Sequence, residues 1–550
     1  MKRKWKVFIG VSKITALTVI ALGLVSFMGC GSGDDAPFLA TTTAPAAIAD
    51  PIQTDTGLVS GASTDTMELG FYDFTSVRHT FSRLVGEPGK AVRVYKGIPY
   101  AAPPVGDLRW KPPQPVTPWI GVRDCTEYGP MTPQKFPQSF FYDYVPESGM
   151  SEDCLYLNVV TPAKTTGDRL PVMVFFHGGG LTDGYSNSDS YNNPALPQHG
   201  MVLVTVNSRL NVIGFMAHPA LTAESPNQAS GNYGTLDLIA ALQWVQKNIA
   251  AFGGDPNNIT INGQSGGSGK CMFLLSSPLA KGLFHKAILQ SLFFPIYRAG
   301  VNYGAGSYGG ISLAAAEQNG VALAEKLGIT DTGAAGLAAL RAKTWQEIVT
   351  ASHMDPAFVT NFTVDGWSLL DTIPNIFDAA KQHDVPLIAG VTGEEVEEAG
   401  RVSFFKLAFG LPGLGAQLTA MSSGKNSKFY TYVFTHVPDP WKAVGQFAPH
   451  AADLLYMLNT MEIFGKFPAA IVNPVTVPID IGMPTAKDMW VSEFVMNAVV
   501  NFCKTGDPSV PAMGVNWPAF ENTNQYYADI GYPVLVKTGF GSLNTWQPPR

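Results

Sequence analysis

The sequence is poor in charge. Asp, Glu, Lys and Arg make up only 14% of its 550 residues, whereas 46% of the residues are hydrophobic. The net charge is −7, and the first 29 residues carry five positive charges and no acid, so removing them takes the charge from −7 to −12. A nucleic-acid-binding protein needs a basic surface to meet phosphates. Nucleic acid is therefore excluded as a partner.

Cysteine is also scarce. The five cysteines are too few and too scattered to predict a metal site, so we expect no metal. Cys271 and Cys503 lie in apolar stretches with helical spacing, which predicts inert core residues.

The N-terminus is typical of a targeting segment. Residues 2–6 are basic, and the apolar run Ile14–Met28 is short for a bilayer core of about 30 Å. We predict a signal peptide over residues 1–29. Phe27-Met28-Gly29-Cys30 resembles the lipobox of bacterial lipoproteins, which implies an exported protein whose membrane contact is a lipid on Cys30. An ordinary secretory signal or an uncleaved anchor is the alternative.

The rest of the chain divides into a short tether and one large domain. Residues 30–52 are rich in Ala, Thr, Gly, Pro and Asp without periodicity, which indicates a flexible tether. Residues 53–550 show no repeat and no second linker, so we expect one continuous catalytic domain.

Short apolar segments alternate with amphipathic ones in this domain. Strands are predicted at Leu170–Phe176, Met201–Val206, Asn258–Asn262, Ala287–Gln290 and Pro386–Val391, and helices at 236–252, 313–327 and 489–503. This alternation predicts an α/β fold, a mostly parallel sheet flanked by helices on both faces. Reactive residues on such a sheet gather beyond the carboxyl ends of the strands.

The strongest chemical motif is Gly263-Gln264-Ser265-Gly266-Gly267, between a predicted strand and a predicted helix. This context is typical of the nucleophile turn of α/β-hydrolases, where flanking glycines let a strained serine project its hydroxyl. The following helix N-terminus places a partial positive charge beside the developing oxyanion. The motif predicts Ser265 as a nucleophile.

A second glycine motif follows another predicted strand. In His177-Gly178-Gly179-Gly180, bare backbone N–H groups can approach a substrate carbonyl. Each such donor to an oxyanion is worth roughly a factor of 10²–10³ in rate.

Together these motifs resemble the type-B carboxylesterase family, whose members have the α/β-hydrolase fold. The stretches that carry the resemblance are Tyr95–Trp110, Ser151–Asn158, Ser230–Asn258 leading into Ser265, and Asn501–Pro508 with Trp517. The resemblance extends over roughly residues 53–540 and implies a carboxylic ester hydrolase.

In an α/β-hydrolase the catalytic residues follow the chain order Ser, acid, His, which limits the candidates for the acid and the histidine that act with Ser265. By resemblance, His450 matches the catalytic histidine, with His436 and His383 as rivals among the nine histidines. The acid matched by the family is Glu395. Glu394 and Asp365 stay open as competitors.

The resemblance implies a mechanism without a cofactor. His450 takes the Ser265 proton, Glu395 orients His450, and the N–H groups of Gly179, Gly180 and Gly266 hold the oxyanion. The expected partner is a small-molecule or polymeric ester.

The sequence departs from the family pattern at several places. The family's disulfide partner of Cys154 would fall near Thr132, so Cys125 is the available candidate for a bridge to Cys154. Gln264 replaces the common Glu before the nucleophile, and Gly266 the common Ala. Tyr144 stands about where cholinesterases carry a Trp. Losing the carboxylate and the Trp argues against quaternary cations as substrates, and we expect a neutral ester of moderate or large size.

Two length changes affect the surroundings of the site. Glu395 and His450 are 55 positions apart, shorter than is typical of the family, and residues 66–90 look like an insertion. We therefore expect a reduced helical cap and an open cleft.

The rival in another class is a non-catalytic adhesion or binding protein on the same fold. Among enzymes, a lipase and a polyester or aromatic-ester hydrolase stay open.

Overall fold

The protein is described from a computed structural model. The described residues are 47–48, 50–73, 78–135, 148–291, 309–353, 360–396, 421–422, 424–443, 447–461 and 484–540. The chain divides into two units, residues 1–44 and 45–550, and every described residue belongs to the second. The predicted signal peptide, Cys30 and Tyr144 lie outside the described residues.

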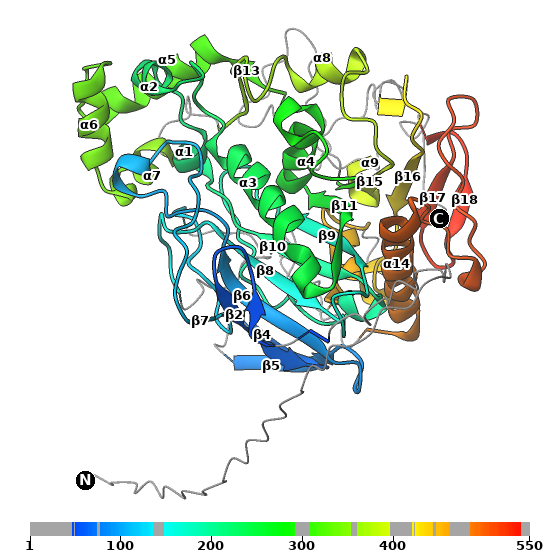
Figure 1. Cartoon of the computed structure of the whole chain (residues 1–550). Helices are drawn as coiled ribbons and strands as arrows, with labels where there is room; N and C mark the ends of the chain where they lie inside the picture. Colours follow the sequence, from blue (N-terminus) through cyan, green and yellow to red (C-terminus); the bar gives the residue numbers. More distant parts are fainter. Residues whose placement is uncertain are drawn as a thin grey trace, which may run out of the picture. The chain divides into compact units, whose positions relative to one another are not determined.

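The second unit is built on an eleven-stranded sheet (Figure 1). The order is β18-β17-β16-β15-β12-β11-β9-β10-β8-β6-β3, parallel from β17 to β10 and antiparallel at both margins. The strands are β3 Ala62–Thr64, β6 Val92–Pro99, β8 Tyr156–Thr161, β9 Leu170–Phe176, β10 Val202–Val206, β11 Gly254–Gln264, β12 Lys286–Gln290, β15 Leu387–Thr392, β16 Phe429–Phe434, β17 Tyr527–Ile530 and β18 Leu535–Lys537. The predicted mostly parallel sheet is confirmed.

Helices cover both faces of this sheet. The described α-helices are α1 Asn211–Phe215, α2 Pro219–Glu224, α3 Tyr233–Asn248, α4 Gly266–Ser276, α5 Leu313–Lys326, α6 Ala334–Ala342, α7 Trp345–His353, α8 Ile373–Asp378, α9 Gly393–Val396, α12 Asp439–Ala443, α13 Ala452–Met457 and α14 Ala486–Thr505. The predicted helix at 236–252 is α3 continued by a 3-10 turn over Ile249–Phe252, and those at 313–327 and 489–503 lie within a few residues of α5 and α14.

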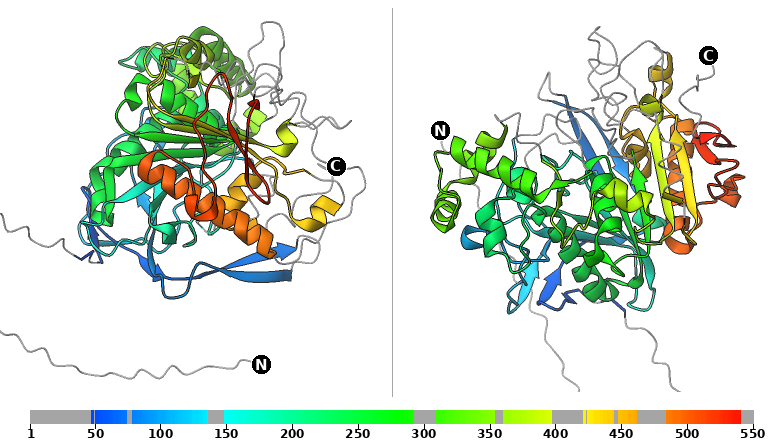
Figure 2. Two further views of the ribbon diagram at one scale, coloured as in Figure 1. Left: turned by 90° about the vertical axis from the view of Figure 1, so that its right-hand side faces the viewer. Right: turned by 90° about the horizontal axis from the view of Figure 1, so that it is seen from above.

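Strand β9 shows how the sequence produces two cores. Its side chains alternate in direction, as in any strand. Val172, Val174 and Phe176 join the core under α3 and α4, whereas Met173 and Phe175 join the core under α13 and α14. Figure 2 shows α14 in orange, and this helix contacts β9 and β11. The uninterrupted apolar run of this strand is therefore explained by burial on both faces.

The predicted insertion over residues 66–90 contains an antiparallel hairpin of β4 (Met67–Asp73) and β5 (Arg78–Val85). Gln198 holds its base: its side-chain amide donates to the carbonyls of Asp65 and Lys90 at 2.7 Å, and its side-chain oxygen accepts from the Glu87 N–H at 2.7 Å. The insertion is thus fixed to the body at the hairpin's base.

The folded body begins upstream of the predicted boundary at residue 53. Ala47 pairs with Thr165, and Ile48 and Ile52 are buried in the core. Ile52 belongs to β1 (Ile52–Gln53), which pairs with β2 (Leu58–Ser60) in a small sheet completed by β7 (Val122–Asp124). Residues 47–48 and 50–52, placed in the tether from composition, therefore make contacts with the domain because two isoleucines supply apolar surface.

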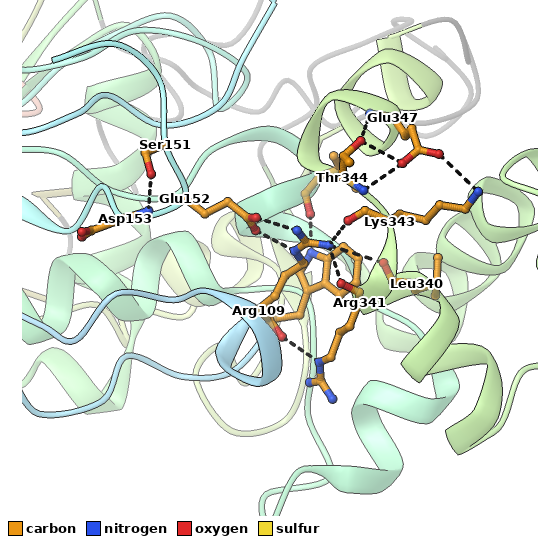
Figure 3. Close-up of polar contacts among 11 residues, drawn as sticks. Arg109, Ser151, Glu152, Asp153, Leu340, Arg341, Lys343, Thr344 and Glu347 are labelled. Carbon is orange, nitrogen blue, oxygen red and sulfur yellow. Dashed lines mark hydrogen bonds and ion pairs between the residues drawn. The ribbon is translucent and has the colours of Figure 1, made fainter.

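The helical segment between β12 and β15 is fastened to the body through Arg109 (Figure 3). The buried guanidinium makes a two-pronged ion pair with Glu152, with nitrogen–oxygen distances of 2.6 and 2.5 Å. Its third nitrogen donates to the carbonyls of Leu340, Arg341 and Lys343 at the end of α6. A helix terminus leaves carbonyls without an intrahelical partner, and here the Leu340 carbonyl also accepts from the Lys343 N–H. Arg109 thus caps the end of α6 and joins it to the domain.

None of the helices in the described part of the chain combines the length and the apolar character needed to cross a bilayer.

Candidate active site

The carboxyl ends of neighbouring parallel strands bring the candidate residues together. Gly178–Gly180 follow β9, Ser265 follows β11, and Glu395 follows β15. His450 follows β16 and the helix α12. This edge of the sheet is where loops of an α/β fold form binding sites.

Ser265 occupies a strained turn between β11 and α4. Its φ and ψ are 57° and −122°, and its backbone N–H donates to the Gln290 carbonyl at 3.0 Å. The glycines on either side are required by close approach. A Cβ on Gly263 would lie 2.1 Å from the Gly267 oxygen, and one on Gly267 would lie 2.0 Å from the Phe176 oxygen. The turn is compact, yet Ser265 itself is partly exposed.

The glycine loop after β9 lies against this turn. Gly179 and Gly180 have positive φ values of 88° and 67°, which favour glycine. A Cβ on Gly178 would lie 3.3 Å from the Ser265 Cβ, and one on Gly266 only 1.8 Å from the Gly180 oxygen. The family's common Ala at position 266 is therefore excluded here by the backbone of the loop.

Three backbone N–H groups near Ser265 are candidate donors to an oxyanion. Among the described residues, the N–H groups of Gly179, Gly180 and Gly266 have no acceptor. Gly266 begins α4, so the helix dipole adds partial positive charge at the same place. This loop and helix N-terminus can accept an anionic oxygen.

Glu395 and His450 form a buried acid–imidazole pair. His450 Nδ1 is hydrogen bonded to Glu395 Oε1, and the other carboxylate oxygen accepts from the Thr392 N–H at 2.7 Å. The side chain of Glu395 is nearly inaccessible, with 1% of the residue exposed. Because Nδ1 is bonded to Glu395, Nε2 points away from the acid. It lies 3.3 Å from the side-chain nitrogen of Gln264, the neighbour of Ser265. The imidazole therefore faces the serine turn with the nitrogen that can accept a proton.

The rival residues have other partners. His436 Nε2 lies 2.8 Å from Asp488 Oδ1 on α14, and His383 Nε2 lies 2.8 Å from the Ser277 carbonyl. Asp365 Oδ1 accepts from the backbone N–H groups of residues 367, 368 and 369, as a turn-capping carboxylate does. The side chain of Glu394 lies outside the described residues.

A second buried carboxyl lies beside this pair. Asp453, on α13, accepts a hydrogen bond from the Tyr432 hydroxyl. Burial raises the pKa of Asp453 to about 6; the Tyr432 bond and His450 oppose this rise, and Glu395 adds to it. The sequence showed an acid three residues after His450, but its environment depends on β16 and α13 meeting in space.

Lys270 is a further residue without an assigned role from the sequence. It lies on α4 and is 1% exposed, and its Nζ donates to the His177 carbonyl at 3.1 Å. The sequence feature that could have identified Lys270 is a lysine inside the otherwise apolar stretch after Ser265. Burial lowers the pKa of Lys270 to about 7.

The cysteines of the body are free, buried thiols at positions 125, 154, 271 and 503. The candidate Cys125–Cys154 bridge is thus not formed. Thr132, the position where the resemblance placed the family's partner cysteine, is close enough to Cys154 to influence its thiol through a hydrogen bond. Burial raises the pKa of both thiols, of Cys125 and of Cys154, to about 12.

Sequence comparison defines the class. The profile of the carboxylesterase family matches residues 75–405 and 409–544, so the chain belongs to that family. With the fold described above, it is an α/β-hydrolase of the carboxylic ester hydrolase class.

Individual relatives agree with this class. A stretch of 236 residues is 45% identical to fumonisin B1 esterase of Sphingopyxis macrogoltabida and covers 43% of this chain but only 42% of that protein. Liver carboxylesterase 1 of Oryctolagus cuniculus is 29% identical over 515 residues, which cover 79% of this chain and 85% of that protein. A solved structure of PNB esterase superposes with a TM-score of 0.70 at 27% identity, covering 90% of this chain and 99% of the other.

Proposed function

We propose that the protein hydrolyses carboxylic esters through a Ser265–His450–Glu395 triad and a covalent acyl-enzyme. The observation that carries the proposal is the arrangement around the turn. The strained Ser265 lies against glycines whose N–H groups have no acceptor among the described residues. The His450 imidazole is bonded to Glu395 through Nδ1, and its Nε2 lies beside Gln264, the residue before Ser265.

The first half of the reaction forms the acyl-enzyme. Ser265 Oγ attacks the ester carbonyl carbon while His450 Nε2 takes the hydroxyl proton. The carbonyl oxygen becomes an oxyanion, which accepts hydrogen bonds from the N–H groups of Gly179, Gly180 and Gly266. The tetrahedral intermediate then expels the alcohol, which receives the proton from His450.

The second half regenerates the enzyme. Water attacks the acyl carbon and gives its proton to His450 Nε2, and the second tetrahedral intermediate releases the carboxylic acid as the proton returns to Ser265 Oγ. Throughout, Glu395 holds the Nδ1–H tautomer and stabilises the imidazolium.

A neutral substrate fits the residues nearest to the serine. Gln264 places an uncharged amide where the family commonly has a carboxylate, so a quaternary cation finds no negative partner at this position. We propose a neutral ester of moderate or large size.

The test is turnover of p-nitrophenyl esters of increasing acyl length by the wild type, Ser265→Ala and Ser268→Ala. Ser268 is the matched control, because it lies on α4, directly after the serine turn, with a buried hydroxyl that has no hydrogen-bond partner in the described part of the chain. We expect loss of turnover for Ser265→Ala alone. Unchanged turnover by Ser265→Ala would refute the proposed nucleophile.

We also propose that the protein is exported and anchored by a lipid on Cys30. The motif at residues 27–30 and the position of Cys30 ahead of the domain support this. Expression of the full chain with labelled palmitate should label the wild type and not Cys30→Ser. Equal labelling of both would contradict lipidation at this cysteine.

A further inference from the structure

We propose that Lys270 is a positioning residue of the ester-hydrolysing site, whose buried ammonium fastens the glycine loop through His177 and adds positive charge behind its amides. The inference rests on the proposed function, because it assigns Lys270 a role in holding the oxyanion donors.

The position of Lys270 links the two halves of the candidate oxyanion site. It stands on α4, the helix that begins directly after Ser265, and every residue of this helix is buried. Its Nζ donates at 3.1 Å to the carbonyl of His177, the residue that leads into Gly178–Gly180. The serine turn and the glycine loop are thus joined by one side-chain hydrogen bond.

The charge of Lys270 has no partner at ion-pair distance among the described residues. Burying an ammonium group without an ion pair is expensive. An apolar side chain at this position would continue the apolar core around Phe273 and Leu274 without that penalty. A lysine at this position is therefore better explained by a role at the site than by packing.

Asp183 lies against the same loop. A Cβ on Gly179 would meet Asp183 Oδ1 at 2.4 Å, so the carboxyl group lies against the glycine loop. Burial raises the pKa of Asp183 to about 6, and the attraction of Lys270 opposes this rise. The glycine loop therefore has a half-buried acid and a buried base close to it.

The other titratable groups near Lys270 are neutral at ordinary pH. Burial, assisted by Lys270, lowers the pKa of His177 well below its usual value. Burial raises the pKa of the Cys271 thiol far above neutrality, and Lys270 opposes this rise. Asp183 in turn favours the charged form of Lys270 against its burial.

The charges of Asp183 and Lys270 make the electrostatic surroundings of the glycine loop depend on pH. As pH rises through the region of 6 to 7, Asp183 gains a negative charge and Lys270 loses its positive one. Both changes make the surroundings of a developing oxyanion less favourable. The contribution of this pair to kcat should therefore fall with rising pH.

The test compares kcat and KM of the wild type, Lys270→Met, Lys270→Arg and Lys286→Met from pH 5.5 to 9.5. Lys286 is the matched control: it is a buried lysine on β12 whose pKa is likewise lowered by burial, and its ammonium bonds Asn258. For Lys270→Met we expect kcat at pH 6.5 to fall roughly 10- to 100-fold with little change in KM.

The pH profile separates this role from a purely structural one. Relative to Lys270→Met, the wild type should lose its advantage in kcat as pH rises above 7. Lys270→Arg, which stays charged, should keep that advantage to pH 9.5 and provides the readout if Lys270→Met fails to fold. A folded Lys270→Met with the wild-type kcat and profile would overturn the proposal, as would an equal effect of Lys286→Met.

Ser265→Ala, measured in parallel, distinguishes the two levels of inference. Turnover that survives in Ser265→Ala defeats the proposed function itself. Turnover that vanishes in Ser265→Ala but is unaffected in Lys270→Met defeats only the role of Lys270.

Discussion

Replacing Gly266 by alanine tests the geometry of the oxyanion site directly. The added methyl carbon would lie 1.8 Å from the Gly180 oxygen, 2.5 Å from its carbonyl carbon and 2.7 Å from its Cα. All three atoms are backbone, so no side-chain rotation relieves the contact. Because real Cβ contacts essentially never fall below 3.0 Å, the loop must retreat by about 1 Å or more, a misplacement that can cost roughly 100-fold in rate.

We therefore expect Gly266→Ala to lower kcat by about 10²-fold, close to the loss of one oxyanion donor. KM should change by less than about threefold, because the donors act mainly on the transition state. The assay is steady-state hydrolysis of p-nitrophenyl butyrate, with circular dichroism to verify folding.

The matched control is Gly333→Ala at the exposed N-terminus of α6. There the nearest atom to an added Cβ is the Asp331 side-chain oxygen at 3.2 Å, and kcat should stay at the wild-type value. A Gly266→Ala enzyme with kcat within about threefold of wild type would refute the claim that the Gly180 loop must hold this position.

Four further substitutions test separate parts of the account. Glu395→Gln should lower kcat by roughly 10³- to 10⁴-fold in the same ester assay, because the wrong tautomer of His450 is then favoured; a loss below tenfold would exclude Glu395 as the orienting acid. Asp453→Asn removes a buried acid whose pKa burial raises to about 6, so the substitution should stabilise the protein more at pH 7 than at pH 4 in urea unfolding, and an equal effect at both pH values would contradict this. Lys270→Met should stabilise the protein by about 2 to 3 kcal/mol more at pH 6 than at pH 9 in urea unfolding. The reason is that the penalty for burying the ammonium is full below the folded pKa of about 7 and fades as pH rises toward the unfolded pKa of 10.5. Equal stabilisation at both pH values would count against a buried charge. Arg109→Met should lower the free energy of unfolding by about 3 to 5 kcal/mol, because the buried Glu152 loses its ion-pair partner and the Arg341 and Lys343 carbonyls lose the donor that Arg109 supplies, and an unchanged urea midpoint would refute that role.

The sheet and the serine turn were predictable because their signals are local. The apolar run of β9 indicates a strand buried on both faces, and the glycines around Ser265 are each explained by a backbone atom within about 2 Å of a missing Cβ. His450 was selected among nine histidines by resemblance, since no local pattern distinguishes it.

Other features depend on which segments meet in space. Asp453 is perturbed because α13 brings it to Tyr432 on β16, and Lys270 is informative only because its ammonium reaches the His177 carbonyl. The sequence left a Cys125–Cys154 bridge open for the same reason, since sequence spacing carries no information on which thiols face each other, and the structure has both thiols free.

The most direct test of the central claim is covalent trapping of the nucleophile. The wild type, treated with diisopropyl fluorophosphate and digested, should carry one phosphoryl adduct on the peptide that contains Ser265, in step with loss of esterase activity. Ser265→Ala should remain unlabelled. An adduct on another residue that accounts for the inactivation, or full activity after Ser265 is modified, would contradict the account.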